Sequence, residues 1–116
     1  MKLPRQVYAI RHNPTQRMYI GSSADVKRRI NNHMKALRNG SHTVGDMQKD
    51  FNVHGEDYSF FILDEIKTWA DRSKEYFWMK KYNTCTRGVG YNYKDHAKTQ
   101  LSKFVVGELD GAIQNQ

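Results

Sequence analysis

Hydrophobic and polar residues alternate near the start of the chain with the two-residue period of a β-strand. The alternation runs over residues 6–12 and again over residues 17–22, and residues 13–16 between them (Asn-Pro-Thr-Gln) are a turn signal. The pattern therefore predicts a β-hairpin. A four-residue turn places Tyr8 opposite Gly21.

Helical spacing follows the hairpin. Ser22-Ser23 is a candidate N-cap for a helix that runs through Leu37, and Asn39-Gly40 is expected to end it. A second helix is predicted from about Val44 to Asn52, and a third from about Ala70 to Tyr82.

Residues 58–63 are apolar on both faces, which favours a buried central strand. The element order is strand, strand, helix, helix, strand, helix, which indicates a small mixed sheet covered by helices. Apolar residues recur every four positions in residues 97–116, but Gly107 and Gly111 weaken a helix there. We expect this tail to be a docking helix or a linker.

Length and composition limit the class of protein. A chain of 116 residues with 38% apolar residues predicts one globular domain. No apolar run approaches the roughly 20 residues of a membrane span, so no membrane partner is expected, and the N-terminus lacks the apolar stretch of a signal peptide. Cys85 is the single cysteine, which excludes an internal disulfide and fits a reducing cytoplasm.

The positive charge is concentrated in the first third of the chain. The net charge of +7 comes from residues 1–38, which hold nine basic groups and one acid, whereas residues 39–116 hold ten and eleven. A local positive field attracts polyanions and predicts nucleic-acid binding, although a solvated surface is the ordinary alternative. The candidate contacts are Arg17, Lys27, Arg28 and Lys35.

Two tyrosines lie on one face of the predicted hairpin. Tyr8 and Tyr19 would be diagonal neighbours, about 7–8 Å apart. Gly21 opposite Tyr8 would leave space above the strand for a ligand. The ordinary alternative is a pair of half-buried strand tyrosines.

The first helix carries two polar residues close to its apolar stripe. His33 falls within the stripe of Val26, Ile30, Met34 and Leu37, and Arg29 lies at its edge, four residues before His33. A half-buried guanidinium requires a partner, and its planar fork suits phosphate. A hydrogen-bonded core histidine remains the alternative for His33.

Glu75 lies at the centre of the apolar arc of the third helix, among Trp78, Met79 and Tyr82. An inward carboxylate needs a partner. One alternative is a buried ion pair with Arg29. The other is a hard cation such as Mg²⁺, which takes one or two protein carboxylates and also binds substrate phosphate.

These residues resemble the GIY-YIG nuclease family, in particular the catalytic domain of phage intron-encoded homing endonucleases. Gln6 stands where the first motif has glycine, and Val7 replaces isoleucine. The segments that carry the resemblance are Gln6-Val7-Tyr8, Tyr19-Ile20-Gly21, Arg29 with His33, Asn39-Gly40-Ser41-His42, Phe51-Asn52-Val53-His54-Gly55, Glu75-Tyr76-Phe77-Trp78 and Gly90-Tyr91-Asn92.

The resemblance implies an α+β fold, with a small three-stranded antiparallel sheet flanked by helices, and a nuclease domain over residues 1–96. It also implies hydrolysis of phosphodiester bonds in double-stranded DNA with Mg²⁺ or Mn²⁺, leaving 5′-phosphate and 3′-hydroxyl ends. The expected metal ligand is Glu75. The expected catalytic residues are Tyr8, Tyr19, Arg29, His33, His42, Glu75 and Asn92.

Each expected residue has a role. Tyr8 is the general base, its phenolate favoured by nearby cations or a proton relay, and Tyr19 orients water or phosphate. Arg29 and His33 assist, with Arg29 stabilising transition-state charge. His42 contacts phosphate or shuttles a proton, and Asn92 orients a phosphate or the Glu75 side chain.

Other functions remain compatible with the sequence. A non-catalytic basic nucleic-acid-binding domain predicts salt-sensitive binding without metal dependence. A nuclease with a histidine metal site is a weaker alternative, because the five histidines lack metal-ligand spacing. A protein-interaction module is also weaker, because it gives no reason for inward Arg29 and Glu75. Homing endonucleases of this family usually read long sites through a separate C-terminal DNA-binding region, which is expected to be absent from this chain.

Overall fold

One three-stranded sheet organises the computed structural model, which describes residues 4–68 and 71–95. The strands follow the order β2-β1-β3 and every pairing is antiparallel. The element order alone predicts a mixed sheet, and that prediction is wrong. The antiparallel sheet that the family resemblance implies is confirmed. The elements are β1 (Arg5–His12), β2 (Arg17–Ser23), α1 (Val26–Arg38), α2 (Gly45–His54), β3 (Tyr58–Ile66), α3 (Ser73–Lys81) and a 3₁₀ turn, η1 (Tyr93–Asp95).

The β1–β2 hairpin has the predicted register, with Tyr8 opposite Gly21 and Ile10 opposite Tyr19. Its turn is closed by a bond of 2.7 Å from the Gln16 amide to the His12 carbonyl. Gln16 takes a positive φ of 63°, which lets a turn of this length return the chain in register.

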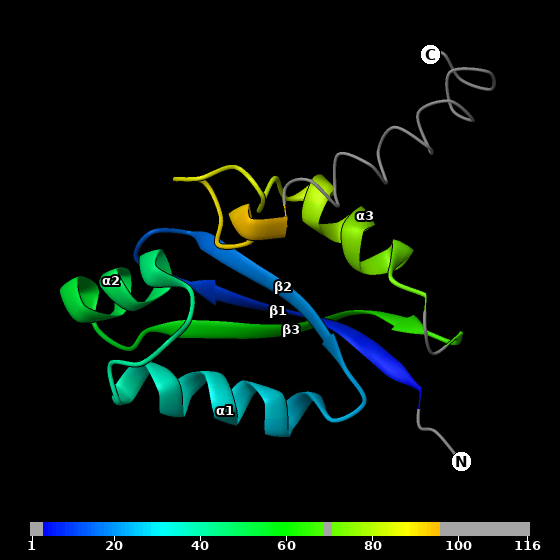
Figure 1. Cartoon of the computed structure of the whole chain (residues 1–116), viewed down its shortest axis with the longest axis horizontal. Helices are drawn as coiled ribbons and strands as arrows, with labels where there is room; N and C mark the ends of the chain where they lie inside the picture. Colours follow the sequence, from blue (N-terminus) through cyan, green and yellow to red (C-terminus); the bar gives the residue numbers. More distant parts are fainter. Residues whose placement is uncertain (1–3, 69–70, 96–116) are drawn as a thin grey trace.

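Helices flank the sheet (Figure 1), and two apolar clusters lie between them and the strands. On one face Tyr8 and Ile10 of the sheet cluster with residues of α1 and α2, namely Val26, Met34, Leu37 and Met47. On the other face Met79 of α3 clusters with Val7, Ala9, Ile20 and Ile66 of the sheet. Because strand residues alternate between faces, Tyr8 belongs to the first cluster and its neighbours Val7 and Ala9 to the second.

Helix α1 buries the predicted stripe, since Val26, Met34 and Leu37 are all buried. Its N-cap is Asp25, whose carboxylate accepts from the Arg28 amide at 3.1 Å. The prediction of a cap at Ser22-Ser23 is therefore wrong. Both serines lie in β2, which continues one pair beyond the predicted strand, and a carboxylate directly before the helix is the better acceptor.

The ends of the other helices differ slightly from the predicted limits. Gly55 ends α2 with a φ of 83°, and its amide donates to the Phe51 carbonyl. Helix α3 begins at Ser73; the predicted start at Ala70 and the tail of residues 97–116 lie outside the described residues.

The prediction of a buried central strand at residues 58–63 is wrong. The central strand is β1, and β3 pairs with it on one side only, so it is an edge strand in the described part of the fold. Phe60, Phe61 and Ile62 are consequently exposed. A run of apolar residues predicts a strand, but it does not determine how many strands pair with it.

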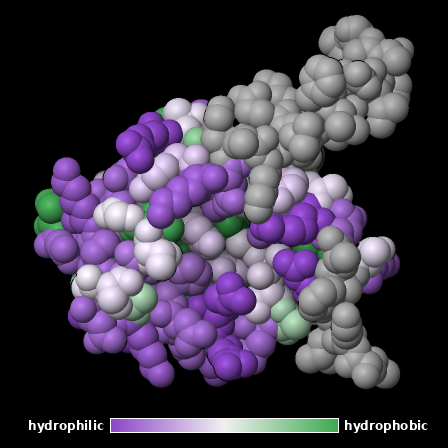
Figure 2. All heavy atoms as spheres, viewed as in Figure 1, coloured by the Kyte–Doolittle hydropathy of each residue, from purple (hydrophilic) through white to green (hydrophobic). Residues whose placement is uncertain are grey.

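Among the described residues, no helix has the length and apolar character needed to cross a bilayer. The surface over α1 and α2 is mostly hydrophilic in the view of Figure 2. Lys27, Arg28 and Lys35 of α1 are exposed. They border a shallow groove of about 430 Å³ that also includes Asn31 and Asn32.

Candidate active site

The two hairpin tyrosines form the floor of the candidate site. Their ring centroids are 6.3 Å apart, and Tyr8 has no exposed surface. A Cβ added to Gly21 would lie 2.6 Å from the Tyr8 hydroxyl and 3.1 Å from the Tyr19 ring. The space above Gly21 is therefore filled by the Tyr8 phenol itself, and the prediction that it stays open for a ligand is wrong.

Two histidines connect the Tyr8 hydroxyl to the start of α2. His33 Nε2 lies 3.0 Å from Tyr8 Oη, and His33 Nδ1 lies 2.8 Å from His42 Nε2. The Val44 amide donates to His42 Nδ1 at 3.0 Å. The structure therefore brings His33 and His42 together with Tyr8, although they come from a helix and a loop.

Burial controls the charge of these groups. It raises the pKa of Tyr8 well above the usual range of a phenol, and the neighbouring Tyr19 adds to that shift while Arg29 opposes it. Burial likewise raises the pKa of Tyr19. The expectation that nearby cations favour the Tyr8 phenolate fails in the free protein, because one exposed arginine does not offset the loss of water around the phenol.

The histidines are neutral for the same reason. Burial lowers the pKa of His33 to about 4, with His42 and Arg29 adding to the effect. Burial also lowers the pKa of His42. A neutral imidazole donates from one nitrogen and accepts at the other. The partner at one ring nitrogen therefore decides whether the other nitrogen donates or accepts.

Glu75 points inward as predicted and is only 4% exposed. Its partner is Arg72, whose Nε donates to Glu75 Oε1 at 2.6 Å. The alternative ion pair with Arg29 is wrong, because Arg29 is exposed on α1 rather than half-buried. The spacing of three residues within the helical region could have identified Arg72, which the sequence reading missed.

The carboxylate and Arg29 both lie within electrostatic range of the phenols. The charge of Glu75 raises the pKa of both Tyr8 and Tyr19, while the charge of Arg29 lowers both. Residues from β1, β2, α1 and α3 therefore surround one site. This is the arrangement expected of a centre that handles a charged substrate.

The carboxylate fits a hard divalent cation in one respect. The hydrogen bonds described for Glu75 engage only Oε1, so Oε2 has no partner among the described residues. Within those same residues, no three carboxylate, histidine or cysteine side chains form a metal cluster. A cation here would take one protein carboxylate and complete its shell with water or phosphate, as Mg²⁺ commonly does.

Both polar atoms of the Asn92 side chain bond the backbone of β2. Its Oδ1 accepts from the Ile20 amide at 2.8 Å, and its Nδ2 donates to the Ile20 carbonyl at 2.9 Å. The Tyr91 amide donates to the Met18 carbonyl at 2.9 Å. These bonds complete the outer edge of β2 and support the strand that carries Tyr19. The orienting role of Asn92 toward phosphate or Glu75 stays a prediction.

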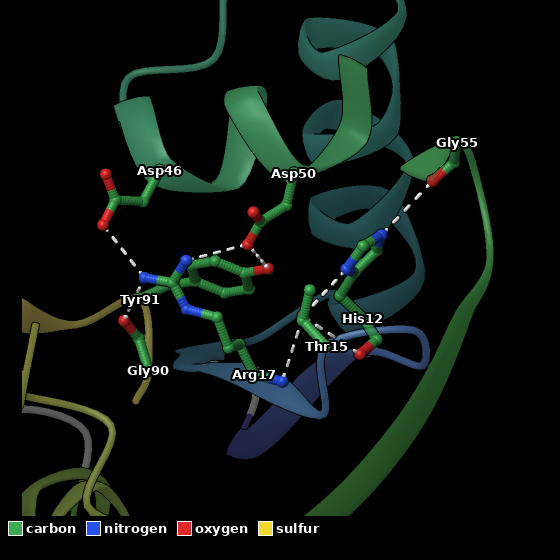
Figure 3. Close-up of polar contacts among 8 residues, drawn as sticks. All are labelled: His12, Thr15, Arg17, Asp46, Asp50, Gly55, Gly90 and Tyr91. Carbon is green, nitrogen blue, oxygen red and sulfur yellow. Dashed lines mark hydrogen bonds and ion pairs between the residues drawn. The ribbon is translucent and has the colours of Figure 1, made fainter. Parts of the chain in front are cut away.

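Arg17 is held by carboxylates of α2 (Figure 3). Its guanidinium donates to Asp46 and Asp50, each at 2.9 Å, and its side chain is 14% exposed. It also lies over the Tyr91 ring, whose hydroxyl donates to Asp50 at 2.7 Å. This engagement joins the hairpin to α2, and the DNA contact of Arg17 stays a prediction.

Two further residues of the site carried no sequence signal. Gln48 accepts from the His42 amide at 3.0 Å and donates to the Leu37 carbonyl at 2.9 Å. Val44 supplies the amide that reaches His42. The Gln48–Leu37 bond depends on how α2 folds back on α1, which local periodicity does not report, and the Val44–His42 bond depends on the conformation of the loop before α2.

The chain is similar to known proteins in sequence and in fold. A curated relative, intron-associated endonuclease 1 of Enterobacteria phage T4, is 34% identical over 91 residues, which are 77% of this chain and 36% of that protein. The chain thus spans about a third of the length of this relative.

Solved structures of similar proteins include two of the catalytic domain of intron endonuclease I-TevI. A mutant form matches with a TM-score of 0.69 and 30% identity, covering 78% of this chain and 94% of that one. A second structure, described as the catalytic domain of a homing endonuclease, matches with a TM-score of 0.66 and 30% identity, covering 75% and 95%. Residues 5–92 match the GIY-YIG catalytic domain, and the chain belongs to that family.

Proposed function

We propose that this chain is a divalent-metal-dependent endonuclease that hydrolyses phosphodiester bonds of double-stranded DNA. The observation that carries the proposal is a buried phenol–histidine chain, Tyr8 to His33, with the buried carboxylate of Glu75 within electrostatic range of the phenol. Membership of the GIY-YIG family and the names of its similar proteins, both endonucleases, support this reaction class.

The phenols are proposed to handle the attacking water. Tyr8 accepts the proton of that water, and Tyr19 beside it orients water or phosphate. His33 holds the Tyr8 oxygen in position through its bond of 3.0 Å. Because the pKa of Tyr8 is raised in the free protein, its ionisation has to be assisted when substrate and metal are bound.

Arg29 is proposed to stabilise charge on the reacting phosphate. It is exposed, so its guanidinium is accessible to a ligand, and it lies close enough to lower the pKa of both phenols. A planar guanidinium near the point where charge develops is a common source of transition-state stabilisation.

Glu75 is the residue that would hold Mg²⁺ or Mn²⁺. When bound there, such an ion supplies Lewis-acid charge to the phosphate and to the departing oxygen. Arg72 is bonded to Oε1 of the same carboxylate, which leaves Oε2 for the ion. The proposed products carry 5′-phosphate and 3′-hydroxyl ends.

The exposed basic residues of α1, Lys27, Arg28 and Lys35, are proposed to contact the DNA backbone. By analogy with the similar proteins, the activity is of the homing type, in the cytoplasm of a bacterial host. Long-site recognition then requires a further DNA-binding region, consistent with the 36% of the relative that this chain spans.

Cleavage of supercoiled plasmid tests the proposal. We expect nicking or cutting with Mg²⁺ and none with EDTA. Glu75→Gln should abolish cleavage while DNA binding in a gel-shift assay is retained, and Glu65→Gln, at an exposed site on β3, is the matched control. Binding that is metal-independent, with no cleavage by the unaltered chain, would instead identify a non-catalytic nucleic-acid-binding domain.

Two further substitutions test the assigned roles. Tyr8→Phe removes only the hydroxyl that bonds His33, so full activity in that variant would exclude Tyr8 as the base. Arg29→Ala should reduce cleavage far more than Arg28→Ala. Equal losses would indicate general electrostatic binding and no specific role for Arg29.

A further inference from the structure

The chain of hydrogen bonds that ends at Tyr8 begins at a main-chain amide. Val44 is the N-cap of α2, and the first amides of a helix have no partner within it. The Val44 amide instead donates to His42 Nδ1 at 3.0 Å. A main-chain N–H can only donate, so His42 Nδ1 carries no proton in this arrangement.

One fixed donor determines the direction of every bond that follows. A neutral imidazole with an acceptor at Nδ1 must carry its proton at Nε2. His42 Nε2 therefore donates to His33 Nδ1 across 2.8 Å. By the same rule His33 carries its proton at Nε2, which donates to Tyr8 Oη across 3.0 Å.

Protonated forms of either histidine are incompatible with the same contacts. A doubly protonated His42 would oppose its Nδ1–H to the Val44 amide. A doubly protonated His33 would oppose two donors across the His33–His42 contact. Burial, which lowers the pKa of both rings, agrees with a neutral pair.

The loop that carries His42 is held so that the ring meets both partners. Gln48 accepts from the His42 amide at 3.0 Å and donates to the Leu37 carbonyl, which ties the loop to α1 and α2. The two imidazole rings stack with centroids 5.1 Å apart. The side chain of His42 therefore has little freedom to turn and reverse its donor and acceptor.

We propose that the Val44 amide, acting through His42, fixes His33 as a hydrogen-bond donor to Tyr8. His42 is then a positioning residue, and not the proton shuttle or phosphate contact expected from the sequence; its importance for catalysis rests on the proposed nuclease function. His33 cannot take the proton that Tyr8 loses, because the nitrogen facing Tyr8 already carries one, so that proton leaves to water. The hydrogen bond from His33 Nε2–H to Tyr8 Oη is kept when Tyr8 ionises, and it strengthens because the oxygen becomes charged.

Nitrogen NMR of the histidine side chains tests the assignment on the unaltered chain. The spectrum distinguishes a protonated from an unprotonated ring nitrogen, and at neutral pH we expect the proton of His33 and of His42 at Nε2. A spectrum with the His33 proton at Nδ1 would overturn the proposal. This measurement needs no substitution, so it does not depend on whether a variant folds.

Two substitutions of His42 that are isosteric with each other either keep or reverse the bond to His33. His42→Gln keeps an N–H that can donate to His33 Nδ1, whereas His42→Glu offers only an acceptor and should move the His33 proton to Nδ1. We expect the Gln variant to retain the Nε2–H form of His33 and most of the cleavage activity. The Glu variant, measured at a pH where His33 is neutral, should lose the donor to Tyr8 and about ten- to hundredfold in cleavage rate.

The two proposals fail in different ways. If His33 keeps its proton at Nε2 in both His42 variants, the positioning role of His42 is refuted, whatever the cleavage rates are. If the unaltered chain shows the expected NMR pattern but cuts no DNA with Mg²⁺, the nuclease proposal fails and the hydrogen-bond assignment is supported. Urea unfolding of each variant confirms that the comparison is made on folded protein.

Discussion

Gly21→Ala is the smallest change that should displace Tyr8. The added methyl would lie 2.6 Å from the Tyr8 hydroxyl oxygen and 2.7 Å from Cζ, whereas ordinary contacts begin at 3.4 Å. The hydroxyl therefore has to move by most of an ångström. Tyr8 is fully buried and its oxygen is bonded to His33, so there is no open space into which the ring can turn.

Two losses follow, and they are measured separately. Overpacking of this kind costs about 1–3 kcal/mol, which urea unfolding would detect as a lower midpoint. A misplacement of about 1 Å at a reacting group can cost about 100-fold in rate, which plasmid nicking with Mg²⁺ would detect. Both effects should appear at a temperature where the variant is still folded.

Gly45→Ala is the matched control, because an added Cβ at Gly45 meets nothing within 4 Å. It lies at the start of α2, where alanine should be neutral or stabilise by less than about 1 kcal/mol. If Gly21→Ala has the stability and cleavage rate of the unaltered chain, the close packing of Tyr8 over Gly21 is not a constraint on the site.

Three further predictions concern charge. The pKa of His33 is lowered to about 4 from 6.5, so between these pH values the unfolded state binds more protons than the folded state. The free energy of unfolding should therefore fall by roughly 3 kcal/mol as the pH drops from about 6.5 to about 4. In urea titrations, His33→Gln should reduce this pH dependence. Arg17→Met leaves two partly buried aspartates unpaired and should cost about 3 kcal/mol in urea unfolding, whereas unchanged stability with weaker DNA binding would support the predicted DNA contact. Arg72→Gln frees Oε1 of Glu75, so Mn²⁺ affinity measured by calorimetry should rise by up to about fivefold, and a weaker affinity would mean that Arg72 helps to shape the metal site.

The hairpin was predictable because its rules are local. A four-residue turn and strict alternation fix which residues face each other, and the observed pairing of Tyr8 with Gly21 follows from that count alone. The inward position of Glu75 was predictable for the same reason, since helical spacing places it among apolar neighbours.

Partners that come from distant segments were not predictable in this way. Asp46 and Asp50 approach Arg17 only because α2 folds back over the hairpin, 29 and 33 residues along the chain. The local sequence around Arg17 therefore does not distinguish an arginine that binds DNA from one that binds a carboxylate. Asn92 was likewise recognised by its motif, but its bonds to Ile20 depend on the tertiary fold.

The strand at residues 58–63 shows a different limit. Its continuous apolar character matched a central strand, yet β3 lies at an edge and leaves Phe60 and Ile62 exposed. Apolar patterning reports a tendency to leave water, but the number of neighbouring strands is set by topology. Side chains at an edge can satisfy that tendency only in part.

The support that Asn92 gives to Ile20 has a consequence for synthesis. The ribosome delivers both tyrosines of the hairpin long before residue 92 emerges, and until then the outer backbone groups of Ile20 lack the partners they have in the finished domain. An incomplete nascent chain therefore holds the two phenols without the completed sheet edge that fixes Tyr19. Under the proposed function, the ability to cut DNA arises only when almost the whole domain has been translated.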